Sequence, residues 1–196
     1  MKIILKTIYL FFLTQCYGQI IPIENMEGNI DLSKENKPYY KDVNGVLNKF
    51  LGTWKYQSNN ELFEITFIKV EKYIGGNYDK DRLTSRFKYI EDGELVYNTY
   101  PSNTSGRDGT PVALDPSADY YAFGGIIRNT NLNKIELEYD EPGITLNGSY
   151  PQQLILTYNP DTGKSHWKIK APSVIRNGEE VYPYRVPSDM ILTKVN

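Results

Sequence analysis

Short segments in which polar and apolar residues alternate run along most of this chain, and they restrict its fold more than any other feature. The clearest cover residues 53–58, 63–67, 83–89 and 134–140, where apolar or aromatic side chains recur mainly at every second position. A period of two is typical of half-buried β-strands, because successive side chains of a strand point to opposite faces. Only residues 46–51 suggest a helical turn. The sequence therefore predicts an all-β fold.

Turn residues between these segments indicate how the strands are joined. Asp92-Gly93 favours a tight hairpin, because both central residues of a type I′ turn have positive φ. Residues 159–163 predict another turn, and Gly124-Gly125 predicts a bulge within a strand. We expect an antiparallel meander of about eight to nine strands that closes into a barrel, since closure removes exposed edge strands. A two-sheet β-sandwich is the alternative.

The size and charge of the chain limit its domain count and its partners. Its 196 residues leave room for one globular domain, and 40% apolar residues supply a real core. We expect an irregular N-terminal segment over 19–44 and a single β-barrel domain over 45–196. The formal net charge of −2 lacks the basic excess that a nucleic-acid backbone attracts, so we expect no nucleic-acid partner.

Residues 1–18 have the pattern of a secretory signal peptide. Lys2 and Lys6 precede a short apolar run. Small residues stand just before the predicted cleavage site between Gly18 and Gln19. The run is shorter than the roughly 20 residues that span a bilayer, so we expect no transmembrane segment. The sequence thus predicts a secreted or periplasmic protein. Lipidation of Cys16 is the alternative, and it would anchor the mature chain to a membrane.

Reactive side chains are scarce in this sequence. The chain has one cysteine, Cys16, and one histidine, His166, which the alternation places on the outer face of a strand. Disulfides and cysteine-ligated zinc are therefore excluded for the mature chain, and no usual Ser-His pair is identifiable from local spacing. Asp115 and Asp119 provide too few ligands for calcium. We expect neither a metal nor a cofactor.

Two acidic patterns are better explained by structure than by catalysis. Asp161-Thr162-Gly163 matches an aspartic-protease motif, but that chemistry needs a second carboxylate, and the residues are ordinary turn formers. Glu136, Glu138 and Asp140 alternate along one strand, as expected for a charged outer face. Neither pattern predicts an enzyme.

The start of the first clear strand resembles that of lipocalin-type (calycin) barrels. A short helical turn is followed by Gly52, Thr53 and Trp54, which gives the Gly-x-Trp pattern of those barrels. The resemblance implies that Trp54 closes one end of a lipocalin-like barrel. The resemblance also implies that an arginine of the last strand stacks on this ring, but the last strand here offers Lys194, which departs from that pattern.

A wider likeness connects the chain with an uncharacterised family of small exported Bacteroidota proteins, a domain of unknown function. The residues that carry it include Asp81, Arg82, Gly93, Pro187 and Lys194. This resemblance implies an extracytoplasmic bacterial protein and brings no known activity. Asp81 and Arg82 with Tyr89 are the one constellation to test for catalysis, but a strand-end ion pair is the simpler role. We therefore predict that the protein is not an enzyme.

The aromatic side chains are the feature that points most directly to a function. The residues expected to face the barrel interior are Trp54, Tyr56, Tyr89, Tyr97 and Trp167. They fill a core, or they line a pocket for a small apolar or aromatic ligand. The alternative is a surface module that binds a protein or a glycan through the long 101–118 loop and tyrosine pairs such as Tyr182 and Tyr184.

Overall fold

The structure is a computed structural model that describes residues 20–26, 37–75, 77–100, 122–142, 152–170, 174–176 and 179–195. Within these ranges the regular elements are almost entirely β-strands. The strands are β1 (Ile20–Pro22), β2 (Tyr39–Lys41), β3 (Gly52–Gln57), β4 (Glu61–Ile74), β5 (Asp79–Glu91), β6 (Glu94–Asn98), β7 (Ala122–Arg128), β8 (Asn131–Tyr139), β9 (Gln152–Asn159), β10 (Lys164–Lys170), β11 (Val174–Arg176), β12 (Glu179–Val181) and β13 (Asp189–Lys194). Two short 3₁₀ turns, η1 (Ile23–Asn25) and η2 (Asn48–Phe50), precede β2 and β3.

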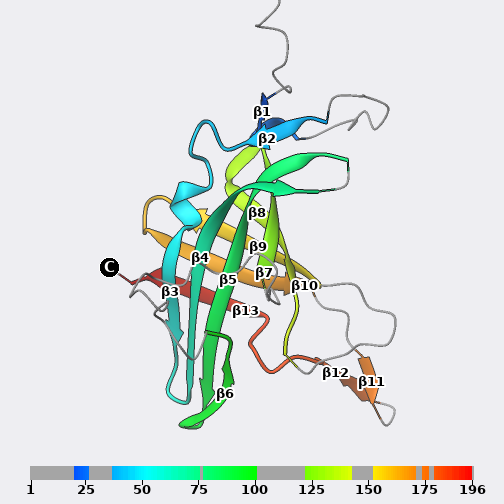
Figure 1. Ribbon diagram of the computed structural model, residues 1–196. Helices are drawn as coiled ribbons and strands as arrows, with labels where there is room; N and C mark the ends of the chain where they lie inside the picture. The colour runs from blue at the N-terminus through cyan, green and yellow to red at the C-terminus, as the bar shows by residue number, and fades with distance from the viewer. Residues whose placement is uncertain are drawn as a thin grey trace, which may run out of the picture.

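Eight of these strands form a closed antiparallel barrel. Their order is β5-β4-β3-β13-β10-β9-β8-β7, and the pair Leu83 and Gly124 joins β7 back to β5. Figure 1 shows β3, β4 and β5 running steeply across β9, β10 and β13. The predicted all-β barrel is confirmed, and the sandwich alternative is not the fold.

The remaining strands are attached to the edge of β5 or stand apart from the barrel. β2 pairs in parallel with the start of β5 and with β1, β6 pairs with the end of β5, and β11 pairs with β12. The segment 19–44, predicted to be irregular, thus contains β1, η1 and β2. These elements have three residues each, which is too short for a period to show in the sequence.

Both special turns expected from glycine have the predicted backbone. Asp92 and Gly93 have φ values of 51° and 81°, as a type I′ hairpin between β5 and β6 requires. Gly124 and Gly125 have φ values of 91° and 125°, and the β7–β8 register shifts across them. The predicted bulge is therefore confirmed.

Aromatic rings fill a cross-section of the barrel. Phe63, Phe87, Tyr139 and Trp167 come from β4, β5, β8 and β10, and each is 0% exposed. Successive ring centroids around this cycle are 5.5, 6.4, 5.4 and 5.1 Å apart. Strands from separate parts of the wall therefore meet through direct ring contacts, and these rings fill this cross-section of the barrel.

Trp54 closes one end of the barrel as the lipocalin resemblance implies. Its Nε1 donates to the Phe50 carbonyl of η2 at 2.8 Å, and its side chain is buried. The Lys194 ammonium lies 5.2 Å from the indole centroid and donates to the Lys49 carbonyl at 3.5 Å. Gly52 has a φ of 95°, and a Cβ there would stand 3.4 Å from Lys194 Cε. Lysine thus takes the place of the arginine that the family usually carries.

Candidate functional site

Most of the aromatic residues predicted to line a ligand pocket are packed into the core. Trp54, Tyr89 and Trp167 are 1%, 0% and 0% exposed. Tyr97 comes from β6 rather than from a barrel strand, and its ring stacks on Tyr89 with centroids 6.5 Å apart. The Tyr89 hydroxyl donates to Glu61 at 2.9 Å. Tyr56 and Tyr97 are half-buried and pack against the core, and Tyr56 is also among the residues that line a groove described below.

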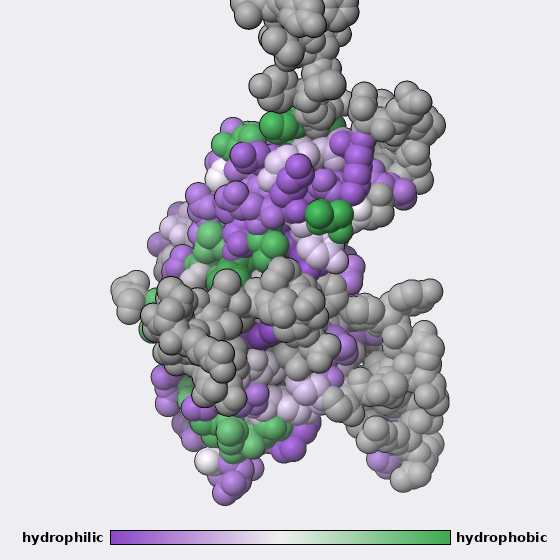
Figure 2. Space-filling model, viewed as in Figure 1, coloured by the Kyte–Doolittle hydropathy of each residue, from purple (hydrophilic) through white to green (hydrophobic). Residues whose placement is uncertain are grey.

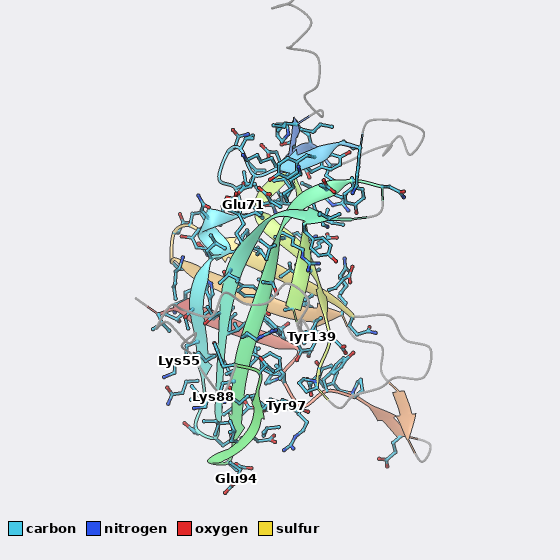
Figure 3. The ribbon with its side chains drawn as sticks, in the orientation of Figure 1. Lys55, Glu71, Lys88, Glu94, Tyr97 and Tyr139 are labelled. Atoms are coloured by element: carbon cyan, nitrogen blue, oxygen red, sulfur yellow. The ribbon has the colours of Figure 1, made fainter. Side chains whose placement is uncertain are left out.

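Glu141 holds the opposite end of the barrel together. Its carboxylate is 2% exposed and accepts bonds from the Tyr97 hydroxyl (3.0 Å), the Tyr139 hydroxyl (2.9 Å), the Arg185 N–H (2.7 Å) and the Val186 N–H (3.2 Å). Burial raises the pKa of Glu141, and burial together with this carboxylate raises the pKa of Tyr97 to about 12. Figure 3 shows Tyr139 and Tyr97 in the part of the barrel above the β5–β6 hairpin tip. Each carboxylate oxygen of Glu141 accepts two hydrogen bonds, so the carboxylate has no acceptor position left for a ligand. The cluster therefore has a structural role, because it fixes the segment that precedes Pro187 and β13.

Asp81 and Arg82 have structural partners at the far end of β5. The Asp81 carboxylate accepts from the Tyr39 hydroxyl at 2.6 Å and from the N–H groups of Lys72 and Asp42 at 2.9 Å each. Lys72 has a φ of 48° in a bulge of β4, so the carboxylate fixes both the bulge and β2. The Arg82 guanidinium lies 3.3 Å from the Tyr73 ring centroid. Asp81 and Tyr89 are separated by about 26 Å of strand, so they form no common site.

The other sequence candidates are placed as ordinary surface groups where the structure describes them. His166 lies on the outer face of β10, with Nε2 2.6 Å from Asp189, whose pKa this contact lowers. Asp161-Thr162-Gly163 forms the β9–β10 turn, as predicted. Within the described ranges no three His, Cys, Asp or Glu side chains gather as metal ligands. Gly18, Gln19, Cys16, Asp115, Asp119 and the 101–118 loop lie outside the described residues.

A groove opens where β3 and β13 separate. The two strands pair only at Lys55 with Thr193 and at Trp54 with Lys194, and beyond these pairs they diverge. The resulting groove has a volume of about 430 Å³, and we call it the seam groove. Its lining residues are Lys55, Tyr56, Gln57, Lys164, Ile191, Thr193, Lys194 and Val195.

The seam groove combines apolar surface with positive charge. Ile191 and Val195 are 50% and 46% exposed, and Tyr56 is also among the lining residues. The ammonium groups of Lys55 and Lys164 make no ion pair or hydrogen bond to the residues that the structure describes, and the lining holds no carboxylate. Figure 3 labels Lys55 beside β3. Such a groove is suited chemically to an anion that carries an apolar body.

Main-chain groups also face the seam groove. The Val195 N–H donates to the Thr53 carbonyl at 2.9 Å. Because bonded and non-bonded pairs alternate in an antiparallel ladder, the N–H and C=O of Ile191 and of Gln57 turn toward the gap. The sequence predicted that Tyr56 faces the barrel interior, and its side chain packs against the core. The sequence carried no signal for the gap, since contacts between the first and last barrel strands leave no local pattern.

On the face shown in Figure 2, the described hydrophobic residues form several patches that are separated by hydrophilic residues. No helix among the described residues has the length and apolar character needed to cross a bilayer. We therefore base the functional argument on the seam groove rather than on these patches.

Comparison with known proteins places the chain in a family without assigning it a role. Searches of the curated proteins and of the solved structures give no match. A family model described as a family of unknown function, DUF6705, matches residues 1–195. A match over nearly the whole chain includes the barrel, the Glu141 tie and the seam groove. The chain therefore belongs to the DUF6705 family of unknown function.

Proposed function

We propose that this protein is a non-enzymatic binding protein that holds a small anionic amphiphile, such as a medium-chain carboxylate, in the seam groove. One observation carries the proposal: two ammonium groups without partners among the described residues, those of Lys55 and Lys164, line the same groove as the exposed side chains of Ile191 and Val195. The ammonium groups supply charge-assisted contacts to a carboxylate, and the apolar side chains cover its body.

The sequence predicts a small apolar or aromatic ligand in the barrel interior, whereas the proposal puts the ligand in the seam groove. An eight-stranded barrel is just wide enough for its own side chains or for one small ligand. Here Phe63, Phe87, Tyr139 and Trp167 occupy a cross-section of the interior. A ligand in the groove leaves those rings in place. The surface module that binds a protein or a glycan through the 101–118 loop stays a prediction.

The test compares three probes that share a dodecyl chain: dodecanoate, dodecanol and dodecyltrimethylammonium, each below its micelle concentration. Binding is followed by tryptophan fluorescence, because Lys194 of the groove contacts Trp54. We expect saturable binding of dodecanoate and weaker binding of the other two. Two exposed charge contacts of about 0.2–1 kcal/mol each predict that Lys55→Gln with Lys164→Gln weakens dodecanoate binding roughly 2- to 30-fold.

The matched control is Lys170→Gln, which removes an exposed ammonium from the other end of β10. It should leave dodecanoate affinity unchanged. The apolar part of the proposal is tested by Ile191→Ser, which should weaken dodecanoate and dodecanol alike. Equal affinity of the double lysine variant and the control would reject the seam groove as the anion site.

We also propose that the protein acts outside the cytoplasm. The support is the pattern of residues 1–18, with a cut between Gly18 and Gln19. The intact mass of the exported protein tests this directly. A chain that begins at Gln19 supports simple secretion, a lipid on Cys16 supports the anchored alternative, and a chain that begins at Met1 contradicts both.

A further inference from the structure

A second cleft lies on another side of the barrel, where the start of β5 faces the bulge of β7. It has a volume of about 260 Å³, and we call it the bulge cleft. The lining residues that matter here are Tyr78, Lys80, Gly124, Glu138, Gln152 and Gln153. This cleft shares no lining residue with the seam groove, so an inference from it stands independently of the proposed function.

The β7 bulge creates open space beside the backbone. Gly124 is buried, yet a Cβ placed on it would meet no atom within 4 Å. At neighbouring Gly125 a Cβ would stand 3.0 Å from Ile135 Cδ1, so that position faces the core. With a φ of 91°, position 124 strongly favours glycine, which leaves the space unfilled.

Two opposite charges, those of Lys80 and Glu138, line this space without forming an ion pair with each other. Among the described residues the Lys80 ammonium makes no hydrogen bond or ion pair, and it lies 5.9 Å from the Tyr78 ring centroid. Burial, with Arg82 nearby, lowers the pKa of Lys80, whereas Glu138 acts in the opposite direction. No ion pair joins Glu138 to Lys80. The cleft thus presents a cation and an anion that each lack a direct partner.

The neighbouring carboxylate of Glu136, in contrast, has direct partners. Glu136 accepts from Lys134 and from the Gln153 amide, both at 2.9 Å, and its pKa is lowered, although burial acts against that shift. Glu136 therefore needs no ligand. This leaves Lys80 and Glu138 as the charged pair that a ligand in the bulge cleft would meet.

We infer that the bulge cleft binds a small zwitterion of free amino-acid size. A ligand carboxylate facing Lys80 and a ligand ammonium facing Glu138 would satisfy both charges at once, with the Tyr78 ring beside the ligand's carbon skeleton. A simple anion would leave Glu138 unpaired, a simple cation would meet Lys80, and a neutral sugar would neutralise neither. The volume lies below the roughly 300–1,000 Å³ of pockets for drug-sized ligands, in keeping with a small occupant.

The experiment titrates the purified protein with each standard L-amino acid at millimolar concentration, using saturation-transfer NMR and calorimetry. At least one amino acid should bind saturably. For leucine the matched probes are 4-methylpentanoate, which lacks the ammonium, and 3-methylbutylamine, which lacks the carboxylate; for another binder the corresponding analogues are used. We expect each analogue to bind at least about tenfold more weakly, since each loses one charge-assisted contact.

Two variants assign the binding to this cleft. Lys80→Gln and Glu138→Gln should each weaken amino-acid binding about tenfold or more. Lys88→Gln, on the same strand at the other end of the barrel, should not change it. Circular dichroism confirms that each variant is folded. The inference is overturned if no amino acid binds, if glucose binds as well as the best amino acid, or if Lys80→Gln and Lys88→Gln behave alike.

Discussion

The substitution Glu141→Gln gives the sharpest test of how the end of the barrel is held. In the wild type the two carboxylate oxygens each accept one tyrosine hydroxyl and one backbone N–H, from Tyr97 with Arg185 and from Tyr139 with Val186. The variant's amide keeps one oxygen, so in either orientation its NH₂ group faces a hydroxyl and a backbone N–H. The hydroxyl can rotate and accept a bond, but the backbone N–H cannot.

The cost follows from counting those contacts. Hydrogen bonds to a charged group contribute about 1.5–3 kcal/mol, and a buried donor left without an acceptor costs about 1–3 kcal/mol. In the variant one backbone N–H is left without an acceptor, and the remaining hydrogen bonds go to a neutral group instead of a charged one. Together these changes predict a loss of about 2–4 kcal/mol in the free energy of unfolding. Urea unfolding with linear extrapolation measures this loss, with an unchanged m-value as the sign of a purely native-state effect.

The control is Tyr97→Phe, which removes one donor and leaves three. It should cost about 1 kcal/mol, in the range of a single hydrogen bond. A loss below about 0.5 kcal/mol for Glu141→Gln, the level of an ordinary surface substitution, would refute the view that Glu141 ties this end of the barrel together.

Three further predictions follow from the described contacts. Lys194→Ala should lower the free energy of unfolding by about 0.5–2 kcal/mol through loss of the contact with Trp54, and Lys194→Arg should largely preserve it; chemical unfolding compares the two, and equal losses would contradict the stacking role. Asp81→Asn should increase amide hydrogen exchange of β2 and of the β4 bulge more than that of β9, because Tyr39, Lys72 and Asp42 lose a charged acceptor; uniform exchange would contradict this. Because the pKa of Tyr97 is raised to about 12, the unfolded chain ionises this hydroxyl first, so stability should fall between about pH 10 and pH 12. Urea unfolding across that range should show a smaller fall in Tyr97→Phe, and an equal fall in both proteins would count against the assignment.

The sequence was most informative where local pattern and local geometry coincide. Alternation around Trp54 predicted β3, the glycine pair 124–125 predicted the bulge, and Asp92-Gly93 predicted the hairpin turn. In each case residues a few positions apart carry the information. The lipocalin resemblance implied an arginine of the last strand on Trp54, and the structure has Lys194 there instead.

The sequence pattern did not predict contacts between strands that are far apart in the chain. Alternation assigns Arg82, Thr84 and Arg86 to the outer face of β5, yet they are 5%, 0% and 6% exposed, because this strand is covered on both faces. The seam groove depends on where β13 stops pairing with β3, and the bulge cleft depends on Lys80 of β5 meeting Glu138 of β8. The alternation of apolar residues within one strand contains no information on which distant strand lies beside it.

Backbone NMR of the isotopically labelled protein during titration with dodecanoate tests the proposed function most directly. Saturable shifts of the Gln57 and Ile191 amides, with the indole N–H of Trp167 unmoved, are the result expected for a ligand in the seam groove. Shifts centred on the Trp167 indole would place the ligand among the interior rings. Those shifts, or the absence of any saturable shift, would contradict binding in the seam groove.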